Sequence, residues 1–158
     1  MSYPEIPHTY VDLERIFGAF SYTEIAGSAD ITVDPKWIRT NIVGVELEGY
    51  HKTIWLHKLL QSALQDAWNG AITACPDYAV CRVASLSTRH KLHNVNKPLS
   101  MHSWGIAIDI NPATNAYGTQ GDIPAEFVQA FKDVGFSWGG DWKTPDPMHF
   151  QYASGKGL

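Results

Sequence analysis

An α+β fold, with a small antiparallel sheet and helices packed to one side, is predicted by three features of this sequence. Some stretches have the apolar periodicity of amphipathic helices, and others have the alternating or β-branched pattern of strands. The two kinds of stretch do not alternate regularly, so a parallel sheet built from βαβ units is not expected. At 158 residues, with 44% hydrophobic and 18% charged residues, the chain should form one domain over 1–158.

The first half of the chain is predicted to contain a short helix near 9–18, a strand in 41–50 and a long helix over 51–75. Alternation of apolar with polar or small residues in "NIVGVELEGY" favours the strand. The long helix is predicted because its apolar residues would share one face. These residues are Ile54, Leu56, Leu59, Leu60, Ala63, Leu64 and Trp68.

The second half is predicted to contain three strands, a polar loop and one further helix. The loop, "STRHKLHNVNKP", covers 87–98, and the helix covers 123–135, with a proline near its start and a glycine at its end. The strands are "AVCRVASLS", "IAIDIN" and "PMHFQY", at 79–87, 106–111 and 147–152.

Charge and composition exclude several classes of protein. A formal net charge of −4 argues against a nucleic-acid binder, and no apolar run approaches the ~20 residues of a membrane span. The N-terminus lacks the basic and apolar regions of a secretory signal, so synthesis in a cytoplasm is expected. Cys75 and Cys81 do not have a CxxC spacing; reduced thiols are favoured, with a local disulfide as the alternative.

The stretch "SMHSWGIAIDINP" places Asp109 in an apolar, strand-like run, seven residues after His102. A buried charge needs a partner, which here is a salt bridge, a hydrogen bond or a metal. In a straight strand the two side chains would point to opposite faces. We therefore predict a bend at Trp104 and Gly105, with His102 before it and Asp109 on the following strand.

The C-terminal "WGGDWKTPDPMHFQ" adds a second histidine and a second carboxylate. Prolines on both sides of Asp146 favour a stiff, extended turn, and His149 opens the strand that follows. Two histidines and one carboxylate, with a position left for water, are typical of a catalytic zinc site. Asp146 would then be a general base, or alternatively only a residue that caps the turn.

Two motifs in this order resemble those of a known enzyme family. "SMHSWGIAID" fits S-x-H-x-x-G-x-A-x-D, "DPMHF" fits [DE]-x-x-H, and "FSWGGDW" is similar to a Gly-Gly-Trp-like segment. They resemble the zinc peptidases of the D-alanyl-D-alanine carboxypeptidase type. These include VanY-like and VanX-like enzymes and the L-alanyl-D-glutamate endopeptidases of bacteriophage lysis. The resemblance covers about 78–152, and 1–50 match no family.

This resemblance implies one zinc ion per chain, held by His102, Asp109 and His149, with Asp146 as the catalytic carboxylate. It also implies a substrate-binding arginine on a strand upstream of the first motif, and Arg82 in "CRVAS" fits that place. The family often has Glu where this chain has the shorter Asp146.

Two tryptophans complete the expected site. Trp138 and Trp142 either wall the cleft or fill the core, and Trp138 is taken as a substrate-binding candidate. The fold implied is the one that these peptidases share with hedgehog-type signalling domains.

The function predicted is zinc-dependent hydrolysis of a peptidoglycan stem peptide by a monomer with no membrane anchor. A short, single-module chain without a signal peptide favours the L-alanyl-D-glutamate endopeptidase of a phage endolysin, made in the host cytoplasm and acting on the cell wall. The alternatives are a D-alanyl-D-alanine carboxypeptidase or dipeptidase, and a non-catalytic, zinc-bearing wall-binding protein.

Overall fold

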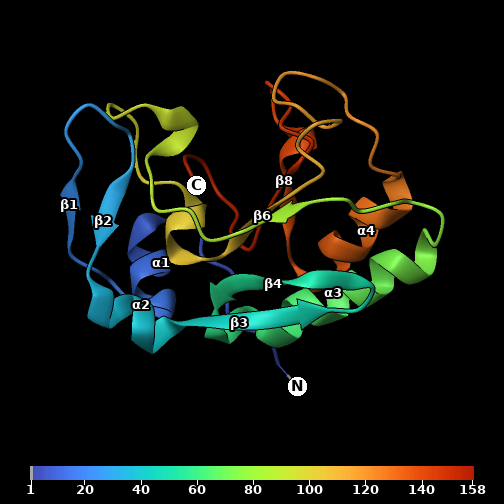
Figure 1. Ribbon diagram of the computed structural model, residues 1–158, viewed down its shortest axis with the longest axis horizontal. Helices are drawn as coiled ribbons and strands as arrows, with labels where there is room; N and C mark the ends of the chain where they lie inside the picture. The colour runs from blue at the N-terminus through green and yellow to red at the C-terminus, as the bar shows by residue number, and fades with distance from the viewer. Residues whose placement is uncertain (1) are drawn as a thin grey trace.

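The computed structural model describes residues 2–158 and confirms the α+β class (Figure 1). Its helices are α1 (Tyr10–Phe17), α2 (Pro35–Asn41), α3 (Gln61–Ala74) and α4 (Ala125–Val134). Its strands are β1 (Tyr22–Glu24), β2 (Ile31–Val33), β3 (Ile42–Leu47), β4 (Tyr50–His57), β5 (Val83–Ala84), β6 (Ala107–Ile110), β7 (Ser137–Trp138) and β8 (His149–Gln151). The 3₁₀ turns are η1 (Lys58–Leu60), η2 (Lys91–His93), η3 (Met101–Trp104) and η4 (Gly139–Asp141).

All strand pairs of the described residues are antiparallel. β1 pairs with β2, β3 with β4, and the remaining strands form a four-stranded sheet in the order β5-β6-β8-β7. Helices α3 and α4 lie side by side below β6 and β8 in Figure 1, while long loops rise above these strands.

Successive side chains of β8 point to opposite faces of the four-stranded sheet. Phe150 points toward the helices, where its ring lies 4.6 Å from that of Phe131 in α4. Phe127 of α4 in turn packs edge-on against Trp68 of α3. One face of the sheet is therefore filled by this aromatic core, and the neighbours of Phe150 in β8 are left to the other face.

The helix predicted over 51–75 is wrong for its first ten residues. Residues 50–57 form β4, which pairs with β3 from Ile42↔His57 to Leu47↔Tyr50, and α3 begins only at Gln61. Buried Ile54 and Leu56 lie two residues apart, so they fit the period of a strand as well as that of a helix. Pairing with β3 decides between the two.

The strand predicted over 79–87 is reduced to β5. The backbone N–H groups of Cys81 and Arg82 donate to the side-chain oxygen of Asn111 instead of to a strand, at 2.8 and 3.1 Å. The predictions also omitted β1, β2, α2 and β7. The other expected elements are present, with the helix of 123–135 ending at Gly135 in the left-handed conformation.

Two further expectations concerned the cysteines and membrane-spanning segments. The thiols of Cys75 and Cys81 are both free. None of the helices within residues 2–158 has the length and apolarity needed to cross a membrane.

The described part of the N-terminal region, residues 2–50, matches no motif but packs against the segment of the first motif. The indole N–H of Trp104 donates to the carbonyl of Gly18 at 3.0 Å, and its ring packs against Phe20. His57, at the end of β4, is 1% exposed and joins the same aromatic cluster through Trp37, which packs against Phe20. The N-terminal segment therefore forms part of the platform under η3.

Stability should fall in mild acid because His57 is buried in its neutral form. Its Nε2–H donates to the carbonyl of Phe17 and its Nδ1 accepts from the N–H of Leu59. Burial lowers the pKa of His57 to about 4, so the unfolded chain takes up a proton at a higher pH than the folded chain. The free energy of unfolding should lose about 2 kcal/mol through this group between pH 7.5 and pH 4.5.

Denaturant unfolding of the wild type and of His57→Gln across this pH range tests the prediction. The variant should be less stable at pH 7.5 and should lack this part of the pH dependence. Parallel pH profiles for the two proteins would contradict it.

Candidate active site

The register of the four-stranded sheet brings Asp109 and His149 together. They are direct Cα partners on β6 and β8, and partners in an antiparallel pair project their side chains from the same face. His149 Nδ1 lies 3.1 Å from Asp109 Oδ1. This is the face opposite the aromatic core, as the alternation of Phe150 and His149 requires.

His102 reaches this face from η3, through the bend that the sequence predicts. Gly105 ends η3 in the left-handed conformation, at φ 67°, and a Cβ there would lie 2.8 Å from the backbone nitrogen of His57 in β4. Glycine is therefore required both by the turn and by the close approach of β4. The bend turns η3 back over the start of β6, and His102 Nε2 lies 3.2 Å from Asp109 Oδ2.

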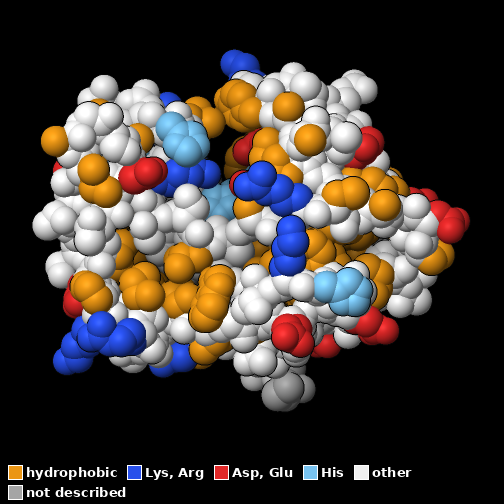
Figure 2. Space-filling view, viewed as in Figure 1, with side chains coloured by type: hydrophobic (Ala, Val, Ile, Leu, Met, Phe, Trp, Pro, Cys, Tyr) orange, Lys and Arg blue, Asp and Glu red, His pale blue; other side chains and the backbone are white. Residues whose placement is uncertain are grey.

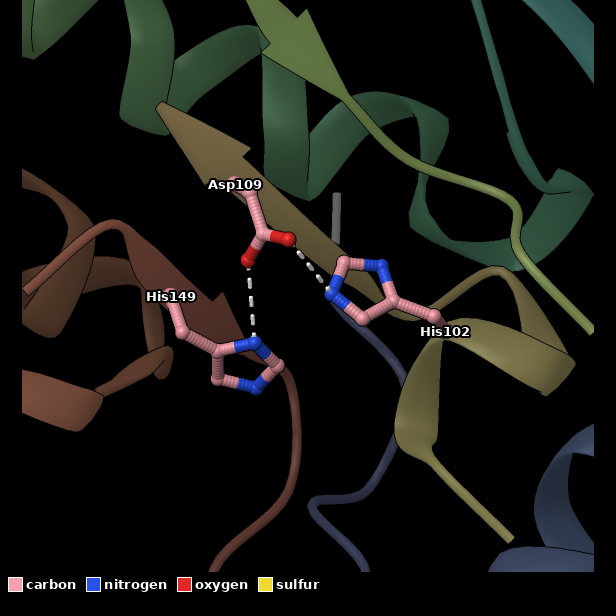
Figure 3. Close-up of side chains that lie close together, drawn as sticks. All are labelled: His102, Asp109 and His149. Carbon is pink, nitrogen blue, oxygen red and sulfur yellow. Dashed lines mark hydrogen bonds and ion pairs between the residues drawn. The ribbon is translucent and has the colours of Figure 1, made fainter. Parts of the chain in front are cut away.

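The three side chains converge on a common point (Figure 3). One ligand atom from each of His102, Asp109 and His149 can be chosen so that all lie within 4.8 Å of one another. Both imidazoles are nearly inaccessible, at 1% and 7% exposure, and the side chain of Asp109 is 16% exposed. The set fits the first-row divalent metals that favour imidazole and carboxylate ligands.

The outer ring nitrogens of the two histidines set their tautomers. His102 Nδ1 lies 2.7 Å from the carbonyl of Ser85, and His149 Nε2 lies 2.9 Å from the side-chain oxygen of Gln151. An oxygen of either kind can only accept, so each outer nitrogen must carry the proton. A neutral ring then points an unprotonated nitrogen toward Asp109 from each side.

This arrangement needs a positive charge at its centre. The Nε2 atom of His102 is buried and has no hydrogen-bond partner, despite its proximity to the Asp109 carboxylate. Two nitrogen lone pairs and a carboxylate repel one another unless protons or a metal ion lie between them. A divalent metal satisfies all three groups in the ionisation states that they need as ligands, so the residues fit the zinc ion that the motifs imply.

The pKa values of Asp109 and His149 reflect the electrostatic interaction between these side chains. Burial opposes ionisation of Asp109, but the hydrogen bonds and charges of His102 and His149 outweigh it and hold the pKa of Asp109 well below its usual range. Burial likewise disfavours the charged form of His149, yet Asp109 raises the pKa of this imidazole above its ordinary value. The carboxylate is therefore ionised and ready to ligate at any physiological pH.

Asp146 is held beside this group by a pinned turn. Its backbone N–H donates to the carbonyl of Gly139 at 2.8 Å, and the N–H of His149 donates to its own carbonyl at 3.0 Å. A Cβ on Gly139 would lie 2.4 Å from the Asp146 carbonyl oxygen, so only glycine permits this contact. The Gly-Gly segment of the sequence thus packs directly against the candidate catalytic carboxylate.

The carboxyl group of Asp146 is half-buried and incompletely paired. Its Oδ1 is buried without a hydrogen-bond partner. Burial raises the pKa of Asp146, opposed in part by the charges of His149, His102 and Arg89. A carboxyl group with a raised pKa and a free oxygen at a cleft has the properties of a general base or acid.

A cleft of about 420 Å³ lies over these residues, and Figure 2 shows the hollow in the molecular surface. It is large enough for a short peptide segment. His102, Asp109, Asp146 and His149 all line it.

Arg82 does not line the cleft: it lies on the exposed segment before β5. Arg89 lines it instead, and its charge reaches Asp146. The backbone of Arg89 is held on η3, because its N–H donates to Ser103 Oγ and its carbonyl accepts from Ser103 Oγ and the N–H of Ser100. Arg89, which the sequence placed in a polar loop, is therefore the arginine that lines the cleft.

Trp138 and Trp142 differ in whether they line the cleft, a question that the sequence left open. Trp138 does not line the cleft; its indole N–H donates to the carbonyl of Pro147 at 2.8 Å, so it steadies the turn of Asp146. Trp142 lines the cleft with its ring 5.3 Å from that of His149. Gln151 was also missed, although its spacing of two from His149 on a strand places both on one face.

Comparison with known proteins gives one match. The family model described as D-alanyl-D-alanine carboxypeptidase matches residues 93–152, a segment that contains His102, Asp109, Asp146 and His149. No curated protein and no solved structure matches the chain. The matched segment and the geometry of the His102–Asp109–His149 cluster together support a peptidase that is similar to the D-alanyl-D-alanine carboxypeptidase family over residues 93–152.

Proposed function

We propose that this protein is a zinc-dependent peptidase that cuts a stem-peptide bond of bacterial peptidoglycan. The observation that carries the proposal is the pair of histidine tautomers. The outer N–H groups of His102 and His149 donate to the carbonyl of Ser85 and the side-chain oxygen of Gln151, so the inner nitrogens face Asp109 as those of metal ligands do. A binding protein could share this feature, but the half-buried Asp146 beside it, with an unpaired carboxylate oxygen, favours catalysis over binding alone.

The residues around the three ligands supply the rest of the chemistry. When bound, a zinc ion supplies Lewis acidity and lowers the pKa of a coordinated water to about 7. Asp146 takes a proton from the attacking water and returns it to the leaving amine nitrogen. Arg89 donates to the scissile carbonyl oxygen as negative charge develops on it. The ring of Trp142 shields this side of the cleft from solvent.

The bond we propose is that between L-alanine and D-glutamate, as in the endopeptidases of bacteriophage lysis whose motifs this chain resembles. On this proposal the protein is an endolysin that acts on the cell wall. The family model favours the second candidate, hydrolysis of a D-alanyl bond as in a carboxypeptidase. The two candidates use the same metal, Asp146 and Arg89, and differ in which residues lie beside the scissile bond.

His149→Ala should lose most of its zinc, because it removes one of three ligands. Protein purified without added metal should contain close to one zinc ion per chain, measured by elemental analysis. His51→Ala is the matched control, since His51 is an exposed residue of β4, outside the cleft, and this variant should retain the metal. Full zinc retention in His149→Ala would contradict the ligand assignment.

Asp146→Asn should remain folded and retain zinc while losing about 10²–10⁴-fold in kcat, because the amide cannot accept the proton of the attacking water. The substitution is nearly isosteric, and the backbone hydrogen bonds of the turn are kept. Turnover of peptidoglycan fragments, zinc content and thermal unfolding should be measured on the same preparation. Wild-type turnover in this variant would leave Asp146 as a turn residue only.

Digestion of purified peptidoglycan identifies the bond. Cleavage between L-alanine and D-glutamate exposes a new D-glutamate amino terminus and frees stem peptides from the glycan, so the turbidity of permeabilised cells should drop. Cleavage of a D-alanyl bond releases free D-alanine and leaves the stems attached. Mass spectrometry of the products separates the two, and free D-alanine without a new D-glutamate terminus would favour the second candidate.

A further inference from the structure

One bank of the cleft carries three basic side chains. Arg89, Lys91 and Lys97, which we call the basic bank, lie within nine residues of a chain whose net charge is −4. All three line the same cleft as the candidate metal ligands. The acidic side chains that line this cleft are those of Asp109 and Asp146, which belong to the site already described, and the last residue, Leu158, lines it as well.

The basic bank has no acidic partner within the protein. None of the ion pairs found in residues 2–158 includes Arg89, Lys91 or Lys97. Burial lowers the pKa of the half-buried Lys91, and the positive charge of Lys97 lowers it further. Like charges held close together destabilise the free protein, so a ligand with negative charge would relieve this repulsion.

The contacts that these side chains do make are with neutral groups. Lys91 Nζ donates to the carbonyl of Gly157 and lies 5.7 Å from the centre of the Tyr10 ring. A guanidinium nitrogen of Arg89 donates to the carbonyl of His90 at 3.2 Å. An ammonium has three donors and a guanidinium five, so most of the donors of the bank remain available.

The loop that presents the bank is held in an uncommon conformation. Leu92 and His93 both have positive φ, at 52° and 50°, although neither is glycine. Such conformations are unfavourable for residues other than glycine and persist where the surroundings hold them. Here the backbone N–H of Lys91 donates to Pro98, and His90 Nδ1 bonds to the carbonyl of Lys97 at 2.5 Å. These hydrogen bonds therefore hold the loop, and the basic side chains that it carries, in a defined position.

We propose that the basic bank is a subsite for a free carboxylate of the stem peptide, and that Lys91 and Lys97 make the enzyme select free over amidated stems. This inference rests on the proposed function, since it takes the stem peptide as the ligand. Lys91 and Lys97 share the cleft with Arg89 and Asp146, so they accept a carboxylate close to the scissile bond. The two sources of such a group are the α-carboxylate of D-glutamate and the carboxylate at the peptide's C-terminus.

Equilibrium binding tests the subsite without turnover. All proteins carry Asp146→Asn, and calorimetry measures Kd for three synthetic L-Ala-D-Glu-containing tetrapeptides: fully acidic, amidated at the D-glutamate α-carboxyl, and amidated at the C-terminus. The acidic peptide should bind about tenfold more tightly than one of the amidated peptides, as expected for a charge-assisted hydrogen bond. The amidated peptide that binds weakly identifies the carboxylate.

Substitutions then test whether the basic bank causes the preference for the acidic peptide. Lys91→Gln and Lys97→Gln should each reduce the tenfold preference, and the double variant should abolish it. Lys36→Gln is the matched control, because Lys36 is an exposed lysine of α2 outside the cleft, and it should retain the full preference. Added salt should weaken the preference in the wild-type bank.

The outcomes separate this inference from the proposed function. Equal binding of acidic and amidated peptides, or a full preference in the double variant, overturns the subsite even if the wild-type enzyme hydrolyses both peptides. A preference that depends on Lys91 and Lys97 supports the subsite even if the wild-type enzyme hydrolyses neither, and in that case the proposed function fails alone.

Discussion

Two histidine nitrogens that face one carboxylate form the interaction on which the rest of this structure depends. Each imidazole donates the N–H on its outer side to an oxygen, so a neutral ring turns an unprotonated nitrogen toward Asp109, and the three residues can each offer a ligand atom within 4.8 Å of the others. Such a cluster is unfavourable in a cavity without positive charge. Metal binding and folding are coupled in this situation, because the same groups that repel one another in the empty site become ligands when the ion is bound.

The sheet is arranged so that this cluster is rigid. Antiparallel pairing of β6 with β8 sets Asp109 opposite His149, and the alternation along β8 gives Phe150 to the aromatic core and Gln151 to the site. A shift of register by one residue would exchange these faces and place His149 in the core. The apolar packing under the sheet therefore protects the register, and through it the geometry of the ligands.

The close approach of His102, Asp109 and His149 could be predicted from the sequence because their motifs are local and carry their own physical constraints. Gly105 is required by the bend, and the prolines around Asp146 require an extended turn. The substrate-binding residues could not be predicted in the same way. Arg82 and Arg89 both precede the first motif, and only the hydrogen bonds of Arg89 with Ser100 and Ser103 decide which one turns into the cleft. Likewise, strand β4 forms because it pairs with β3, and the apolar pattern of 51–75 alone does not indicate this pairing.

The candidate metal ligands and the other residues of the cleft lie on different parts of the fold. His102, Asp109 and His149 depend on strands and on η3, whereas Asp146, Arg89 and the basic bank lie on loops pinned by backbone hydrogen bonds. Side chains on such loops can change without disturbing the backbone that holds them, since the pinning groups are mostly carbonyls and N–H groups. On the proposed function, the three ligands would be the same for either candidate reaction, and the residues on the loops would distinguish the two scissile bonds.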